Sequence, residues 1–140
     1  MVSTLSPARG HIAQISGGLI VFRPAGTNYQ LQLAVDRPLD NAGGQLVEGT
    51  IRVRARKVWT VPSGGNFIQP IVGPPRIAQG RVVQLDEKQM VVQAGTTITV
   101  SLPSEDSAYS LADGPLAPGA LVNVTLEPGA QFEAGGERAS

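Results

Sequence analysis

Cysteine is absent from the 140 residues, and histidine occurs once, at His11. The chain therefore forms no disulfide bond, and it lacks the thiolates and paired imidazoles that ligate most transition metals. With no second imidazole or thiol to share a metal, His11 is expected to be an ordinary surface or hydrogen-bonded histidine. We expect neither a metal nor a cofactor.

Enzyme signatures are also missing. The sequence has no G-x-S-x-G element, no Ser/His/Asp set with spare members, and neither of the common glycine-rich phosphate loops. Carboxylates occur in adjacent pairs at Asp86-Glu87 and Glu105-Asp106, but both pairs fall in expected turns, where solvated charge is the ordinary explanation. The sequence therefore predicts a protein that is not an enzyme.

Long apolar runs are absent as well. The start of the chain, Met1–Pro7, has no basic segment followed by an apolar one, and no apolar run approaches the length that spans a membrane. We expect a cytoplasmic protein with no membrane contact, while export by a route without a signal peptide stays open.

No segment keeps an apolar i, i+3, i+4 pattern over ten residues, so helix content is expected to be minimal. Gly 17 and Pro 11 are high counts, yet 41% of the chain is hydrophobic, which is typical of many short strands joined by tight turns. Because parallel crossovers usually need helices, the predicted class is all-β and antiparallel. Strands are expected at 11–16, 19–23, 29–35, 46–61, 76–85, 89–93, 97–102, 120–126 and 131–133, with one helical turn within 104–111.

The domain organisation follows from these elements. We expect an N-terminal extension at 1–10, a single β domain at 11–133 and a disordered tail at 134–140. The β domain could consist of two tandem modules, 11–61 and 76–133, joined by the Pro/Gly-rich connector 62–75. Three pairs of similar segments support a repeat: Ile12–Gln14 with Ile77–Gln79, Leu31–Val35 with Ile98–Leu102, and Ile51/Val53 with Val122/Val124, at offsets of 65, 67 and 71.

The strand order of the second half resembles that of a small Greek-key barrel of the OB type. A strand interrupted by Gly80 is followed by a hairpin, a third strand, a helical turn and a closing strand. The resemblance concerns the fold only and carries no function.

The segment Ile51–Trp59 is the most informative part of the chain. Arg52, Arg54 and Arg56 alternate with Ile51, Val53 and Ala55, which places three guanidinium groups on one strand face and the apolar side chains in the core. Lys57 then has inward parity and Val58 outward parity, so a bulge is expected near Arg56-Lys57. Trp59 has core parity unless this bulge turns it outward.

The zero net charge conceals an uneven distribution. Residues 1–90 carry ten Lys/Arg and five Asp/Glu, a net +5, whereas residues 91–140 carry one basic and six acidic residues, a net −5. Either the two halves neutralise each other, within one chain or between subunits, or the basic half faces an anionic partner.

Two interpretations follow. The first is a non-enzymatic binding module whose basic strand face engages nucleic acid or another polyanion; the second is a structural protein that forms a homo-oligomer through its charge-complementary halves. The candidate polyanion-binding residues are Arg52, Arg54, Arg56, Lys57, Trp59, Arg76 and Arg81, the last two joining the set if their strand pairs with the arginine strand. The candidate interface residues are Phe67, Ile68 and Ile71, which form an apolar patch within the connector.

Overall fold

The computed structural model describes residues 8–16, 18–35 and 46–134. Within these ranges the chain is all-β, as predicted, and its only helical element is the 3-10 turn η1 (Asp106–Ala108). The strands are β1 (Ala8–Ser16), β2 (Leu19–Pro24), β3 (Gln30–Ala34), β4 (Leu46–Thr60), β5 (Phe67–Gln69), β6 (Val72–Gly73), β7 (Ile77–Leu85), β8 (Gln89–Gln93), β9 (Thr97–Ser101), β10 (Tyr109–Ser110), β11 (Leu121–Leu126) and β12 (Gln131–Ala134).

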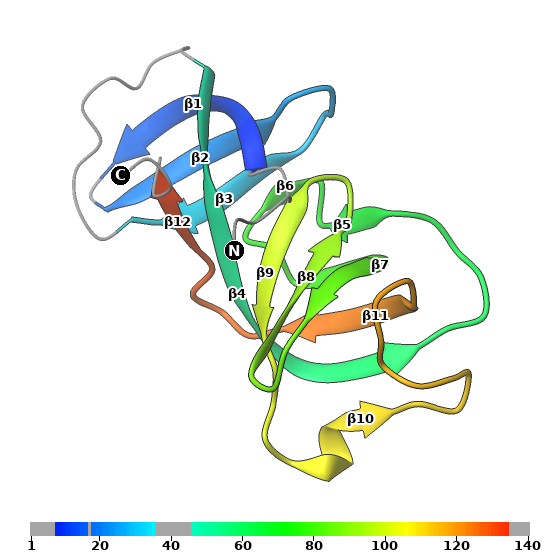
Figure 1. Ribbon diagram of the computed structural model, residues 1–140. Coiled ribbons are helices and arrows are strands. Elements are labelled where there is room, and N and C mark those ends of the chain that lie inside the picture. The colour runs from blue at the N-terminus through cyan, green and yellow to red at the C-terminus, as the bar shows by residue number, and fades with distance from the viewer. Residues whose placement is uncertain (1–7, 17, 36–45, 135–140) are drawn as a thin grey trace.

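The strands belong to one sheet that is organised around β4. The main path of pairing is β1-β2-β3-β12-β4-β11-β7-β8-β9, and further pairings join β1 to β4 and β4 to β9. In the described part of the chain these contacts close two rings of five strands that share β4. Figure 1 shows β4 running from the group of β1, β2, β3 and β12 to the group of β7, β8, β9 and β11. With 15 residues, β4 is about 50 Å long, enough to serve both rings.

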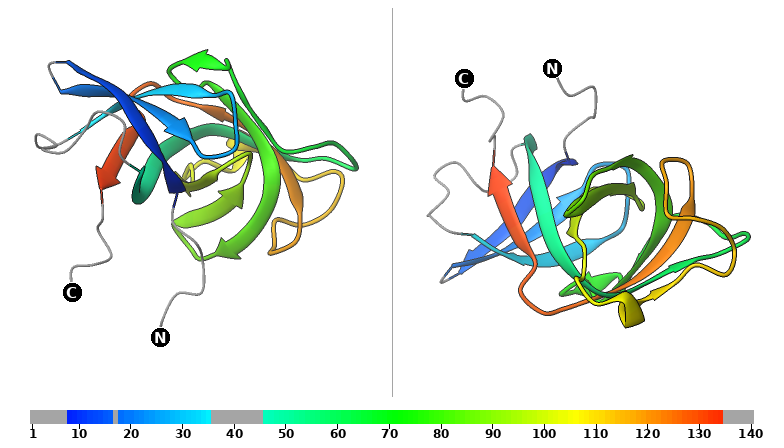
Figure 2. Two further views of the ribbon diagram at one scale, coloured as in Figure 1. Left: turned by 90° about the horizontal axis from the view of Figure 1, so that it is seen from above. Right: turned by 60° about the horizontal axis from the view of Figure 1, so that its bottom comes forward.

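The expectation of an antiparallel sheet is wrong in part, because the sheet is mixed. β4 pairs with β9 in parallel at Arg52–Arg54, and β12 pairs with β3 in parallel at Gln131. The strands between β4 and β9 form antiparallel hairpins, so the chain returns to β4 without the crossover helix that the prediction assumed. One parallel contact lies in each ring, and two short parallel pairings, β10 with β4 and β3 with β6, lie outside the rings. Figure 2 shows the strands from two further sides.

The core confirms the strand faces predicted from the sequence. Ile51, Val53 and Ala55 are each at most 5% exposed, as their positions in the alternating pattern required. The bulge predicted near Arg56-Lys57 is also present: Leu126 pairs with Ala55 whereas Thr125 pairs with Lys57, which leaves Arg56 as the extra residue.

The bulge changes which side of β4 faces outward. Beyond Arg56, Lys57 is exposed and Val58 is fully buried, the reverse of the parity that the first half of the strand establishes. Trp59 is consequently on the outer face and half-buried, while Thr60 is 5% exposed. The single tryptophan therefore joins the basic residues rather than the core.

The hairpins that begin the two rings have the same register. Each carries a one-residue shift in its first strand, after Ile12 in β1 and after Val82 in β7. A Cβ on Gly10 would overlap the carbonyl oxygen of Arg23, and one on Gly80 would overlap that of Gln93, so each hairpin needs a glycine at this close approach. The equivalent pairs are 70 residues apart: Ile12–Phe22 with Val82–Val92, and Gln14–Val21 with Gln84–Val91.

The registers test the sequence repeat segment by segment. The match of Leu31–Val35 with Ile98–Leu102 agrees with the registers. Leu33 pairs with Ile20 of β2, and Val100 pairs with Met90, the residue of β8 that lies 70 positions after Ile20. The other two matches align the wrong residues. Ile12 corresponds to Val82 rather than to Ile77, and Val122 corresponds to Val47 rather than to Ile51.

The fifth strand of each ring comes from the part of the chain that forms the other ring. The first half of β4 pairs with β1, and its second half continues into the other ring beside β9 and β11. After β11, the chain returns as β12, which lies beside β3 and the first half of β4. The second half of β4 thus completes the ring of β7, β8, β9 and β11, and β12, which follows β11 in the chain, completes the ring of β1, β2, β3 and the first half of β4.

Three predictions lie wholly or largely outside the described residues. These are the N-terminal extension at 1–10, of which the structure describes only 8–10 within β1, the segment 36–44, whose Asp, Pro, Asn and Gly residues predict a loop, and the disordered tail at 134–140, of which only Ala134 is described. Three short strands were not predicted, namely β5, β6 and β10, because two or three residues are too few for a period-2 pattern to be recognised.

Candidate anion-binding face

The outer side of β4, β11, β7 and β5 forms a continuous surface, which we call the basic face. Side chains of directly paired residues lie on the same side of a sheet, so the registers determine which residues are neighbours across it. Two rows result. The upper row is Trp59, Asn123, Gln79 and Phe67, and the lower row is Lys57, Thr125, Ile77 and Gln69.

The upper row has an aromatic ring at each end and amides between them. All four of these residues are half-buried. Gln79 is held in place because its Oε1 accepts a hydrogen bond from the Gly65 amide at 3.0 Å. On the other side, β10 pairs with β4 at Val58 and Trp59 and borders the tryptophan.

The neighbouring Tyr109 anchors this border. Its hydroxyl donates to the carbonyl of Pro103 at 2.6 Å. Burial, and then the negative charge of Asp106, raise the pKa of Tyr109 above its usual value, so the phenol stays protonated and keeps this donor role at neutral pH.

A cleft opens below the lower row. Its volume is about 580 Å³, within the range of small-molecule pockets. Arg56 comes from the bulge of β4 and Arg76 from the residue before β7, on the two sides of β11. The cleft is lined by Arg56, Gln69, Pro70, Ile71, Arg76, Ile77, Thr125 and Leu126, a set with two cations and no carboxylate.

Two polar atoms of β11 on this face are buried without a hydrogen-bond partner in the described part of the chain, Oδ1 of Asn123 and Oγ1 of Thr125. A buried polar atom left unpaired costs about 1–3 kcal/mol, so such atoms usually have a role. Thr125 lines the cleft and Asn123 lies one row above it. Both side chains belong to the outer face, although each of the two oxygen atoms has less than 1 Å² of accessible surface.

The arginines predicted from the sequence divide into two groups. All three ladder residues are exposed, but Arg52 forms an ion pair with Glu133, with 3.0 Å between Nε and Oε1. The carbonyl of Arg54 accepts a hydrogen bond from the amide of Glu127, which brings that acidic residue beside the ladder. Arg56 and Lys57 form no ion pair within the described residues, and they adjoin the cleft and the lower row.

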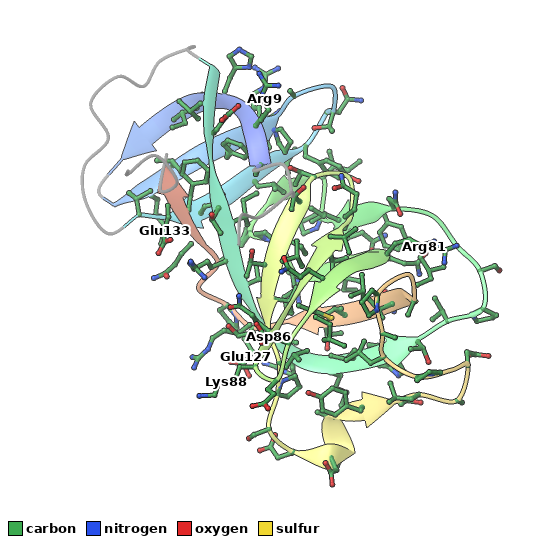
Figure 3. All side chains as sticks on the ribbon, viewed as in Figure 1. Arg9, Arg81, Asp86, Lys88, Glu127 and Glu133 are labelled. Atoms are coloured by element: carbon green, nitrogen blue, oxygen red, sulfur yellow. The ribbon has the colours of Figure 1, made fainter. Side chains whose placement is uncertain are left out.

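Arg76 and Arg81 do not join the ladder directly, because β11 lies between β4 and β7. Arg76 reaches the cleft, where it faces Arg56 across the end of β11. Arg81 lies farther along β7, where its guanidinium donates to the carbonyl of Gly119 at 2.9 Å. Figure 3 shows Arg81 far from Glu127 and Lys88. Arg81 is on the outer side of β7, two residues beyond Gln79, but it does not line the cleft. The sequence could not reveal which of the two arginines reaches the cleft.

The predicted interface segment is also divided. Ile68 is 2% exposed and belongs to the core of its own chain, so it is unavailable to a second subunit. Phe67 is half-buried at the end of the upper row. Ile71 is 56% exposed, and the adjacent Val72 is 61% exposed. An apolar surface therefore exists here, but it is smaller than the sequence suggested.

At β4, acidic residues of the second half of the sequence lie beside basic residues of the first half, so the two charges are not separated in space there. Acidic residues of the second half reach the basic strand through β12 and the start of the β11–β12 connection, as Glu133 and Glu127 show. A second ion pair, Arg9 with Glu48, lies within the first half at 3.0 Å. Both pairs are largely exposed, so each contributes less than about 1 kcal/mol to stability.

The comparisons with known proteins provide no further guide. The chain matches no protein-family model, no curated protein and no solved structure. Among residues 8–16, 18–35 and 46–134, no helix has the length and apolar character needed to cross a membrane, and no three His, Asp or Glu side chains are grouped to hold a metal ion. Function has to be inferred from the basic face itself.

Proposed function

We propose that this protein is a non-enzymatic binding module and that its basic face engages single-stranded nucleic acid or another polyanion. The observation that carries the proposal is the cleft, which is lined by Arg56 and Arg76, by no carboxylate, and by Thr125, whose hydroxyl has no partner among the described residues. Lys57 extends the positive charge along the lower row, and Trp59 adds a ring on the row above.

This combination matches the physical needs of single-strand binding. A positive groove attracts the phosphates, and aromatic rings stack on bases at about 1–3 kcal/mol per base. Arginine is suited to phosphate because its planar guanidinium donates two parallel hydrogen bonds. Two half-buried aromatic residues, Trp59 and Phe67, stand at opposite ends of one row, about three strand spacings or 14 Å apart.

The salt dependence of binding tests the proposal. Replacing Arg56, Lys57 and Arg76 by alanine should weaken binding to an oligothymidylate and flatten the slope of log K against log salt by about 2 units, at about 0.7 per lost phosphate contact. Fluorescence anisotropy of a labelled oligonucleotide between 50 and 300 mM salt measures both quantities.

The matched control removes the same charge elsewhere. The triple variant at Arg9, Arg23 and Lys88 lowers the net charge equally, but these exposed residues lie off the basic face. It should leave the slope within a few tenths of the wild-type value. Equal effects of the two triple variants would show that only net charge matters and would remove the basic face as the site.

Homo-oligomer formation is the second candidate function, favoured by the exposed pair Ile71 and Val72. If this patch joins two subunits, Ile71→Glu should convert an oligomer to a monomer without lowering the melting temperature, because the residue is already exposed. Light scattering at micromolar concentration measures the mass, with Leu111→Glu, at another exposed apolar residue, as control. A wild-type monomer in low salt would exclude assembly as the main role.

The equal registers of the two rings support a finer description of the fold. The chain is an internal duplication of a five-strand unit of OB-like, Greek-key order, in which each copy lends its last strand to the other. The common position of the register shift and the paired glycines Gly10 and Gly80 support this origin, since chance alternation would not reproduce both. The domain then consists of two interlocked modules rather than two tandem ones.

A further inference from the structure

The cleft between Arg56 and Arg76 has a second property besides charge. Four of its lining residues are apolar: Pro70, Ile71, Ile77 and Leu126. A site for phosphate alone would need only the two guanidinium groups, whereas this one places an apolar wall beside them. The ligand should therefore combine an anionic group with an apolar, flat or compact body.

The strand pairings fix how these parts are arranged. The carbonyl of Arg76 accepts a hydrogen bond from the amide of Leu126 at 2.8 Å, and Ala55, next to Arg56, pairs with Leu126 on the other side. The two arginines thus begin two strand spacings apart, about 10 Å, and flank one residue of β11. Ile77 and Thr125 are paired neighbours on the same face, so an apolar and a hydroxyl side chain adjoin between the arginines.

We infer that the cleft holds one nucleotide unit of a single strand, with its phosphate between Arg56 and Arg76 and its base against Ile77 and Leu126. The inference rests on the proposed function and names the chemistry of one part of the same face. A volume of about 580 Å³ accommodates one such unit rather than several. The hydroxyl of Thr125, which is buried and has no partner among the described residues, then gains one from the base edge or the sugar when the side chain turns toward the cleft.

The neighbouring residues fit a strand that continues beyond the cleft. Lys57 pairs with Thr125 and offers the next positive charge, and Trp59 follows two residues later on the same outer side of β4. A fatty carboxylate, with one charge and a long tail, would use the apolar wall but neither the second arginine nor this continuation. The geometry therefore favours a nucleotide over an amphiphilic anion.

The test uses small probes on the full chain. Adenosine monophosphate, adenosine, inorganic phosphate and dodecyl phosphate are each titrated while amide shifts are followed by NMR, and affinity is measured by calorimetry. Adenosine monophosphate should shift amides at Arg56, Ile77 and Thr125 and bind at least tenfold more tightly than adenosine or phosphate. Its affinity should fall at least tenfold in Arg56→Gln/Arg76→Gln and severalfold in Thr125→Val, but not in Arg81→Gln.

The outcomes separate this inference from the proposed function. If an oligothymidylate binds through the basic face but the nucleotide shifts no amide of the cleft, the binding module stands and the nucleotide site is wrong. If neither binds, both proposals fail. If dodecyl phosphate binds and the nucleotide does not, the cleft takes an amphiphilic anion. The substituted residues other than Thr125 are exposed, and unchanged melting temperatures confirm that a lost affinity is not a lost fold.

Discussion

Val53→Asp should leave no folded protein at 25 °C. Val53 is 3% exposed and lies at the centre of β4, where it pairs with Val100 of β9. An aspartate there would bury a carboxylate without a cation or a donor, at a cost of several kcal/mol. Since the total stability of a domain this size is about 5–15 kcal/mol, and β4 belongs to both rings, the loss should unfold the whole domain.

Circular dichroism and thermal melting measure the effect, and the strand supplies its own control. Arg54→Asp introduces the same side chain one residue further along, on the exposed face, and should change stability by less than about 1 kcal/mol. A soluble Val53→Asp protein with wild-type melting would contradict the burial of this position and, with it, the face assigned to the arginine ladder.

Alternation along strands was readable from the sequence because burial on one face of a sheet imposes it directly. Ile51, Val53 and Ala55 were assigned to the core from parity alone, and all three are buried. The bulge was predictable for the same reason: the parity of Lys57 and Val58 contradicts that of the preceding residues, and one extra residue at Arg56 resolves the conflict.

Pairing between distant strands was not predictable in this way. Which strands become neighbours depends on how the rings close, and alternation contains no information on it. The sequence therefore gave no sign that β11 would separate Arg81 from the arginine ladder, or that β12 would bring Glu133 to Arg52. The rule that parallel pairing needs a helix also failed, because hairpins make the return here.

The candidate site was only partly recognisable from the sequence. Arg56, Lys57 and Trp59 were found because they are consecutive on one strand, a local pattern. Thr125 and Asn123 were missed as site residues, although their outward parity on the last long strand was visible from the buried Val122 and Val124. They stand out because each has a buried oxygen without a hydrogen-bond partner among the described residues, a property that a sequence pattern does not contain.

Phe132→Ala should lower the free energy of unfolding by about 3–5 kcal/mol, the second large effect that the structure predicts. Phe132 is 2% exposed on β12, and its ring packs against that of Phe22 with 4.8 Å between centroids. β4 is shaped to receive it: a Cβ on Gly49 would overlap both the ring of Phe132 and the carbonyl oxygen of Glu133. Urea denaturation measures the loss.

The neighbouring residue of the same strand is the control. Gln131 is exposed, so Gln131→Ala should change stability by less than about 1 kcal/mol. A Phe132→Ala protein as stable as this control would show that β12 adds little to the first ring, and the exchange of fifth strands would lose its energetic basis.

Amide hydrogen exchange tests whether each ring is closed by a segment of the other. If each ring is closed by the other ring's last segment, the loss of Phe132 should raise exchange in β1, β2 and β3 more than in β7, β8 and β9, because β12 pairs only with β3 and β4. Ending the chain at Pro128 should have a larger effect of the same kind, and a peptide of residues 129–140 added in excess should restore protection. Uniform loss across both rings would instead show that β4 couples them into one cooperative unit, so that the first ring opens only when the second does.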